Sequence, residues 1–319
     1  DVVMGNLETP VTAERRRITK PPCMPKKNNC LTDRDNEYRR LYFLTFQGRP
    51  DAARLLKEGG FTVLSTANNH AEDQGPEGML DTLQHLNEAG LGAAGTGPTR
   101  DDAWTPYIFE KDGVRTGVIA VTTLSNFRPS EKGAFVAATP FPRILEVLPE
   151  RVRRLRPLVD FVVVTLHYSS ESTHFAEHRE WNLIRELSAA GADLFIGTHP
   201  HVLRGISKEG PMVVFWSMGN FLFDNSKGAW GESGIVLATF VKDGETRTLV
   251  EVAFQPVALD GKPAGLPRPL TGREARQINR KVMDYSRQFR NPKGFLRIDG
   301  DRIAIDPSAG TTESTPGPR

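Results

Sequence analysis

The chain has 319 residues, of which 38% are hydrophobic and 25% charged, an ordinary composition for a soluble globular protein. This composition excludes a collagen-like, coiled-coil or wholly disordered chain. Lys and Arg number 41 and Asp and Glu 39, so the formal net charge is only +2 and we expect no nucleic-acid partner. The apolar run 161–166 has the length of a buried strand and falls far short of the about 20 residues that a membrane helix needs.

Short apolar strands alternate with amphipathic helices along most of the chain. Pro76 marks the start of one predicted helix, and glycines such as Gly90 and Gly191 follow the ends of others. In chain order the predicted elements are strand 2–4, helix 50–58, strand 61–66, helix 76–88, strand 114–122, helix 144–155, strand 161–166, helix 174–190, and strands 194–197 and 212–217.

From about residue 235 the pattern becomes antiparallel. Strands 235–241 and 246–255 are joined by Asp243-Gly244, and a helix over 272–289 and a hairpin that turns at 299–301 follow. Parallel and antiparallel strands combined with helices predict an α/β sandwich with mixed sheets.

We expect a single domain over residues 1–306. Residues 307–319 are rich in Pro, Ser, Gly and Thr and are predicted to form a disordered tail. The chain begins with Asp1, and its first residues already have a strand pattern, so we expect a processed chain or a fragment.

Residues 15–40 carry nine basic and three acidic side chains, a net charge of +6, and have the composition of a loop. This basic loop is either a solvated insertion or a contact for an anionic polymer or membrane surface. Cys23 and Cys30 within it form either a disulfide, which would indicate an oxidising compartment, or two free thiols.

Polar side chains gather just after the predicted strands, where open α/β sheets bind ligands. Four of the seven histidines lie at these strand ends: His70, His167, His199 and His201. Imidazole nitrogen, amide oxygen and carboxylate oxygen without a thiolate favour Mn, Fe, Zn or Ca, as one or two ions. The alternative is that these side chains only satisfy loop backbones.

Two further histidines carry a weaker signal. His174 and His178 are four residues apart in the predicted helix 174–190, a spacing that could hold a metal. His85 lies in the middle of helix 76–88, and we expect it to face solvent.

The ordered set of motifs resembles the CapA family of bacterial capsule-synthesis proteins, of the poly-γ-glutamate synthesis type. The resemblance rests on residues 6–10, 68–75, 167–171, 197–202 and 219–224, which read NLETP, NNHAEDQG, HYSSE, GTHPHV and GNFLFD. It implies a calcineurin-like metallophosphoesterase fold, which is a four-layer α/β/β/α sandwich with mixed sheets.

By this resemblance five residues bind the divalent metal: Glu8, Asn69, His167, His199 and His201. His70 matches the residue that acts on the leaving group or stabilises the transition state, and Glu171 is a second candidate catalytic residue. The remaining matches predict pocket residues: Asn68, Asp73, Asn220 and Asp224.

Two departures from the family pattern are visible. The family normally has an earlier strand that ends in Gly-Asp, whose Asp binds a metal, so we expect this chain to start after that strand and its site to lack one ligand. Gly300-Asp301 lies in a predicted turn and is no substitute. Tyr168-Ser169 stand where the family usually has Trp-Gly, which predicts an altered pocket near the metal.

Four functions stay open at this point. The resemblance implies a protein of capsule or poly-γ-glutamate synthesis with a hydrolase-type metal site, in an extracytoplasmic or membrane-associated setting and with a membrane-bound synthesis or export complex as a partner. The alternatives are a metal-dependent phosphoesterase, a peptide Cα epimerase, and a non-catalytic module that binds the polymer. Because all four share one fold, the fold does not choose among them.

Overall fold

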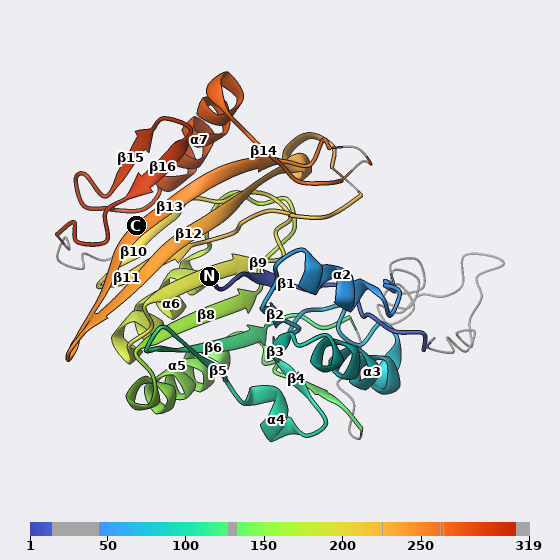
Figure 1. Ribbon diagram of the computed structural model, residues 1–319. Helices are drawn as coiled ribbons and strands as arrows, with labels where there is room; N and C mark the ends of the chain where they lie inside the picture. The colour runs from blue at the N-terminus through green and yellow to red at the C-terminus, as the bar shows by residue number, and fades with distance from the viewer. Residues whose placement is uncertain (15–44, 127–132, 225, 262, 264, 311–319) are drawn as a thin grey trace, which may run out of the picture. The chain divides into compact units, whose positions relative to one another are not determined.

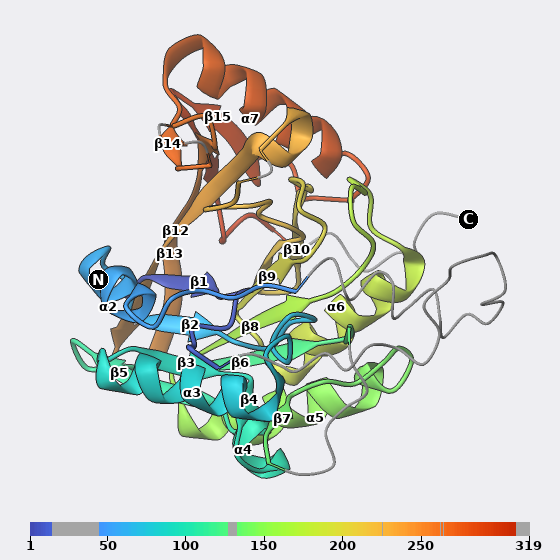
Figure 2. The ribbon, with the colours of Figure 1, turned by 90° about the vertical axis from the view of Figure 1, so that its right-hand side faces the viewer.

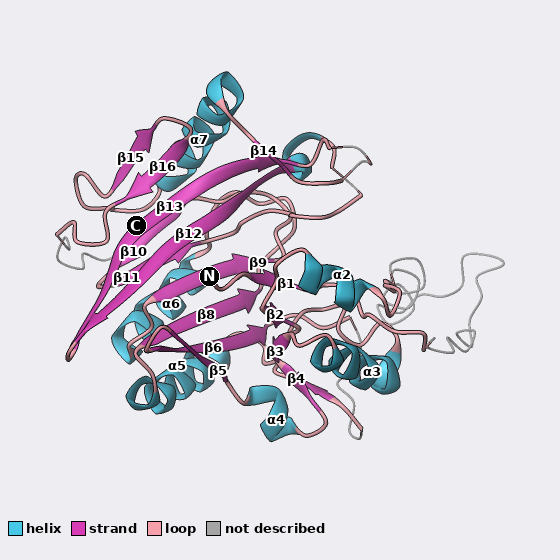
Figure 3. Cartoon of the chain, viewed as in Figure 1, coloured by secondary structure: helices cyan, strands magenta, loops and turns pink. Residues whose placement is uncertain are grey.

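The computed structural model describes residues 1–14, 45–126, 133–224, 226–261, 263 and 265–310 (Figure 1; Figure 3). The chain divides into two compact units. The first consists of Asp1–Thr105 with Ala120–Ala138, and the second of Pro106–Ile119 with Thr139–Arg319. The basic loop, with Cys23 and Cys30, lies outside the described residues, so its predicted disulfide and polymer contact stay predictions.

The first unit is built on a sheet of three parallel strands in the order β1 (Met4–Asn6), β2 (Val63–Ser65) and β3 (Gly92–Ala94). Helix α2 (Ala52–Glu58) precedes β2, and α3 (Gly75–Glu88) follows it. One buried cluster joins the sheet to both helices, because Leu64 of β2 packs with Ala53 of α2 and Leu86 of α3. The unit also contains α4 (Arg100–Trp104) and the antiparallel pair β4 (Thr96–Gly97) and β7 (Phe135–Val136).

The second unit contains a six-stranded mixed sheet, apart from residues 120–122 at the end of one strand, which belong to the first unit. Its order is β10 (Ile206–Glu209), β11 (Met212–Phe215), β9 (Leu194–Thr198), β8 (Phe161–His167), β6 (Val114–Thr122) and β5 (Tyr107–Lys111). Strands β8, β9 and β11 run parallel, while β5 and β10 pair antiparallel with β6 and β11. All seven side chains of β8 are buried, as its unbroken apolar run predicts for a central strand.

Helices α5 (Ile144–Leu155) and α6 (His178–Ala190) cover one face of this sheet, and a long hairpin covers the other (Figure 2). The hairpin consists of β12 (Glu232–Asp243) and β13 (Thr246–Ala258), and Phe240 stacks on Phe161 of β8 with ring centroids 4.3 Å apart. The hairpin's sheet continues through β16 (Arg302–Ile305) and β15 (Leu296–Asp299), with β14 (Arg268–Pro269) paired to β13 and α7 (Gly272–Ser286) packed against it.

The predicted α/β class with mixed sheets is confirmed, and strand 114–122 and helix 144–155 occur with the predicted bounds. The prediction that a helix starts at residue 174 is wrong. Glu177 and Glu180 form a capping box that starts α6 at His178, so His174 lies before the helix and the two histidines do not share a helical face. The single domain over 1–306 stays a prediction.

The structure also describes the start of the predicted tail. Lys208 Nζ donates to the carbonyl oxygens of Pro307 at 2.5 Å and Ala309 at 2.6 Å, and residues 311–319 lie outside the described residues. Among the described residues, no helix combines the length and the apolar character that a membrane span requires.

Candidate functional site

In the second unit, the register of two neighbouring parallel strands brings histidines together. His167 ends β8 and is paired with Thr198, which ends β9. The segment that follows β9 therefore starts beside His167, and it carries His199 and His201. His167 is buried, His199 is half-buried and His201 is 8% exposed. The sheet thus gathers the three histidines that the sequence predicts as metal ligands.

The rings of His167 and His199 meet edge to face, and one nitrogen of each ring lies within hydrogen-bonding distance of the other. His199 Nδ1 lies 3.1 Å from His167 Nε2, and the ring planes are inclined by 62°. Thr198 Oγ1 lies 3.0 Å from His167 Nδ1 and donates to the carbonyl oxygen of Leu166 at 3.4 Å. Because this hydroxyl proton is directed at Leu166, the oxygen accepts from His167 Nδ1–H, and the lone pair of the ring is then on Nε2.

His201 is oriented by an amide and by aromatic rings. Its Nδ1 donates to Asn220 Oδ1 at 2.7 Å, and the Asn220 amide group in turn donates to the carbonyl oxygen of Trp230 at 3.0 Å. The His201 ring stacks on the Trp230 ring at 4.7 Å, with 14° between the planes, and on Phe223 at 5.4 Å. The hydrogen bond to Asn220 fixes the tautomer that has its lone pair on Nε2.

Left-handed backbone is concentrated around these histidines. Among the described residues, five non-glycine residues have positive φ, and four of them lie after β8 or β9: Ser169 (79°), Ser172 (60°), His199 (93°) and His201 (58°). Such conformations cost about 1–3 kcal/mol each and persist only where surrounding contacts enforce them. The strain in these two loops therefore lowers the free energy of unfolding of this unit, and the surrounding contacts hold the loops in one arrangement.

The nitrogen spacing fits a divalent metal ion. With metal–nitrogen bonds of about 2.1 Å, two ligands at angles of about 90–110° lie about 3.0–3.4 Å apart. The 3.1 Å between His199 Nδ1 and His167 Nε2 falls in this range. Neutral imidazole suits Zn and Fe, and hydrogen bonds such as the one to Thr198 raise ligand basicity. His167 and His199 could therefore hold one ion between them.

In the first unit, the predicted residues after β2 form a second polar group. His70 and Asp73 are buried, with His70 Nδ1 2.7 Å from Asp73 Oδ2. The backbone N–H of Phe46 also donates to Asp73 Oδ2 at 2.6 Å, and the Phe46 ring stacks on His70 at 4.1 Å. The carboxylate holds the proton on Nδ1, so Nε2 is the atom of His70 that is able to exchange a proton.

The two asparagines before His70 shape the same turn. Asn68 accepts from His70 N–H at 3.1 Å and donates to the carbonyl oxygen of Leu7 at 2.8 Å. Asn69 donates from Nδ2 to Asn126 Oδ1 at 3.2 Å, so its amide oxygen is the atom that could bind a metal. Glu8 is half-buried and accepts from Asn6 Nδ2 at 3.1 Å.

Two other predicted site residues are more exposed than the histidines. Glu171 and Asp224 are both exposed on loops of the second unit. Sequence reasoning did not single out Phe46, Asn126 or Trp230, because each is remote in sequence from the motif that it supports. Tyr168 is buried and donates from its hydroxyl to the carbonyl oxygen of Trp216 at 3.1 Å, and this burial raises the pKa of the phenol far above its usual value.

Comparison with known proteins identifies relatives. The sequence model of the family described as "Bacterial capsule synthesis protein PGA_cap" matches residues 1–225. The "PGA biosynthesis protein CapA" of Bacillus subtilis (strain 168) is 32% identical over 252 residues, which are 77% of this chain and 60% of that protein. The "Capsule biosynthesis protein CapA" of Bacillus anthracis is 28% identical over 85% of this chain and 60% of that protein. The chain thus spans about 60% of the length of these relatives.

Two solved structures are also similar to parts of this chain. A 5'-nucleotidase precursor from Thermus thermophilus is 18% identical over 74% of this chain and 45% of that chain, with a TM-score of 0.35. A hypothetical protein from the same organism is 17% identical over 68% of this chain and 78% of that chain, with a TM-score of 0.39.

Proposed function

This chain belongs to the family of bacterial capsule synthesis proteins, and we propose that it acts in the synthesis or export of an anionic capsule polymer through a site that binds a divalent metal. The contact between His167 Nε2 and His199 Nδ1 at 3.1 Å carries the metal part of the proposal. Both residues lie in the part of the chain that the family model matches.

The polymer is proposed to be poly-γ-glutamate. This follows from the resemblance and agrees with the B. subtilis relative, whose name assigns it to PGA biosynthesis. The net +6 of residues 15–40 supplies a complementary charge for a polycarboxylate. A capsule polymer is assembled at the cell surface, so we place the protein in an extracytoplasmic or membrane-associated setting, beside a membrane-bound synthesis or export complex.

The reaction that we propose is a hydrolysis that depends on a divalent metal ion. When bound, a divalent ion supplies Lewis-acid polarisation of a carbonyl or phosphoryl oxygen. His167 and His199 would hold it, with the His167 ring oriented by Thr198. In the first unit, His70 has its Nδ1 proton held by Asp73, so its Nε2 is able to take up a proton and, from the imidazolium form, to pass it on. The predictions that Glu8 and Asn69 also bind metal and that Glu171 is catalytic stay predictions.

A phosphoesterase is the second candidate, and the pairing of His70 with Asp73 is compatible with it. A buried carboxylate–imidazole pair is a general acid–base device that both phosphate and acyl chemistry use. The substrate would be a phosphate ester in place of the polymer. A peptide Cα epimerase and a non-catalytic polymer-binding module stay as alternatives.

Metal content measured by elemental mass spectrometry tests the proposal. We expect near-stoichiometric Mn, Fe or Zn in the purified chain and its loss in His167→Ala and His199→Ala. His178→Ala is the matched control, because His178 is an exposed histidine at the start of α6 and its replacement should leave the content unchanged. Absence of metal from the unmodified chain after incubation with each ion would contradict the metal site and favour the binding module.

A further inference from the structure

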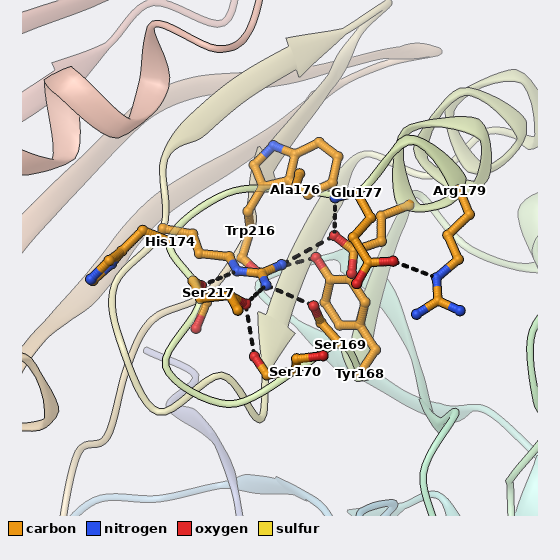
Figure 4. Close-up of polar contacts among 12 residues, drawn as sticks. Tyr168, Ser169, Ser170, His174, Ala176, Glu177, Arg179, Trp216 and Ser217 are labelled. Carbon is orange, nitrogen blue, oxygen red and sulfur yellow. Dashed lines mark hydrogen bonds and ion pairs between the residues drawn. The ribbon is translucent and has the colours of Figure 1, made fainter.

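Arg204 is a buried cation in a polar network of the second unit, and Figure 4 shows the surroundings of one of its partners, Ser169. Its Nε donates to the carbonyl oxygen of Thr173 at 2.8 Å, and its Nη1 donates to Glu180 Oε2 at 3.1 Å. Its Nη2 donates to Ser169 Oγ at 2.6 Å and also to Thr173 Oγ1. Each branch of the guanidinium therefore has an acceptor, in the fixed fork geometry that only arginine provides.

The network joins the two loops that carry the histidines. Ser169 lies two residues after His167, and Arg204 lies three residues after His201. The same loops are joined by two backbone hydrogen bonds, from Ser172 N to the Pro200 oxygen at 2.8 Å and from Tyr168 N to the Thr198 oxygen at 3.1 Å. Arg204 adds a charged side chain that donates to both Ser169 and Thr173.

The backbone of Ser169 shows why such a contact is needed. Its φ is 79°, a conformation that glycine adopts without steric cost and that other residues adopt rarely. The resemblance predicts glycine at this position. The hydrogen bond from Arg204 to Ser169 Oγ offsets part of the strain that serine has in this conformation. Ser169 lies two residues after His167, so the contact stabilises the backbone next to this histidine.

A contribution to stability alone does not explain the Arg204–Glu180 ion pair. Both side chains are 1% exposed, and Glu180 Oε1 is buried without a hydrogen-bond partner among the described residues. Buried ion pairs of this kind commonly add less stability than apolar residues of similar volume, because two charges lose their hydration. Their better-supported use is to specify one conformation.

We propose that Arg204 is a positioning residue that holds the loops after β8 and β9 so that His199 Nδ1 and His167 Nε2 stay at metal-binding distance. This inference rests on the metal site proposed above. It predicts that the loss of Arg204 weakens metal binding and loosens the histidine rings more than it weakens the unit as a whole.

The test compares Arg204→Met with Arg156→Met. Arg156 makes a similar set of contacts at the amino ends of the same strands, donating to Asp193 Oδ2 at 2.6 Å and to the Gly191 oxygen at 3.1 Å. Zn²⁺ affinity is measured by competition with a chromophoric chelator, and thermal unfolding is followed in parallel. We expect both variants to unfold at lower temperature, and only Arg204→Met to bind Zn²⁺ about 10–100-fold more weakly.

A second readout needs no metal. In protein with ¹⁵N-labelled histidine, the ring nitrogens of His167 report its tautomer, which we expect to be the single Nδ1–H form in the unmodified chain and a mixture in Arg204→Met. If Arg204→Met does not fold, Ser169→Ala removes one acceptor without stranding a charge and keeps the Cβ, so the backbone strain at this position is unchanged. It should weaken Zn²⁺ binding about fivefold, the fold-change of roughly one lost hydrogen bond.

The outcomes separate the two proposals. Absence of Zn²⁺ binding to the unmodified chain overturns the metal site, and the tautomer of His167 in Arg204→Met then decides the positioning role alone. A folded Arg204→Met that keeps the single tautomer and binds Zn²⁺ as the unmodified chain does overturns the role of Arg204. Equal losses of affinity in Arg204→Met and Arg156→Met also overturn it, because they indicate a general loss of stability.

Discussion

His70 Nδ1 and Asp73 Oδ2 lie 2.7 Å apart, and both side chains are buried in the first turn that follows β2. The Phe46 N–H donates to the same carboxylate oxygen and helps to hold Asp73 in one orientation. The imidazole is thereby held as one tautomer, with Nε2 directed away from the carboxylate. This arrangement supports a proton-transfer role more strongly than the sequence motif alone.

Asp73→Asn tests that role. The neutral amide holds the Nδ1 proton less strongly and no longer stabilises the imidazolium, so we expect hydrolysis of a chromogenic phosphodiester with added Mn²⁺ to fall by about 10²-fold or more, as for His70→Ala. The double variant should be no slower than either single variant, because the two residues act as one unit. Asp51→Asn, on an exposed carboxylate, is the control. Turnover that is unchanged in Asp73→Asn would remove this pair from the chemistry.

Thr198→Val tests the orientation of His167. Valine has the shape of threonine but offers no acceptor for His167 Nδ1–H, so we expect metal affinity to fall by about 10–100-fold while the fold persists. Thr165→Val, at a buried threonine on the same strand as His167, is the matched control. Isothermal titration with Zn²⁺ measures both. An equal affinity in the two variants would show that Thr198 does not prepare His167 for a metal.

Asp160→Asn tests a charged anchor at the amino end of β8. The hydrogen bond from Arg115 N–H, together with Lys242 and Arg247, holds the pKa of Asp160 below its usual value of 3.8. A lowered pKa stabilises the folded state at every pH above the unfolded value, and this contribution is lost as the pH falls through the folded value. We therefore expect Asp160→Asn to cost about 1–3 kcal/mol at pH 7.

The pH dependence supplies the control for that prediction. As the pH falls below about 4, the free energy of unfolding, measured with urea, should fall more steeply in the unmodified chain than in Asp160→Asn, and one such group adds at most about 1.4 kcal/mol per pH unit to the slope. Parallel curves for the two proteins would assign the acid sensitivity to other carboxylates.

Neutralisation of Arg15, Arg16 and Arg17 tests the basic segment as a polymer contact. If these charges bind a polycarboxylate, replacing all three with Gln should weaken binding of poly-γ-glutamate, and the salt dependence of binding should become shallower. Three arginines exposed on α7 provide an equal number of charges for a control triple variant: Arg273, Arg276 and Arg280. Loss of binding in both triple variants would point to net charge and away from a defined contact.

The sequence pattern predicts the central elements well, because buried strands and amphipathic helices have strong periodicity. It misses short elements, among them β5 and β10, which are the two edge strands of the six-stranded sheet: the apolar run of β5 is only three residues long, and β10 has the single apolar residue Ile206. The histidines at the ends of β8 and β9 are predictable, since parallel neighbours place their carboxyl ends at one edge. The roles of Arg204 and Asn126 are not, because they depend on tertiary contacts with Glu180, 24 residues away in sequence, and with Asn69, 57 residues away.

The path of β6 has a practical consequence for dissecting this protein. Its residues Val114–Ile119 belong to the second unit and Ala120–Thr122 to the first, and the chain passes from the first unit to the second and back before it enters the second again. No single cut of the polypeptide yields either unit as an uninterrupted piece. Separate production of one unit requires two cuts and a new linker or a circular permutation, so an inactive fragment obtained by simple truncation says nothing about the missing half.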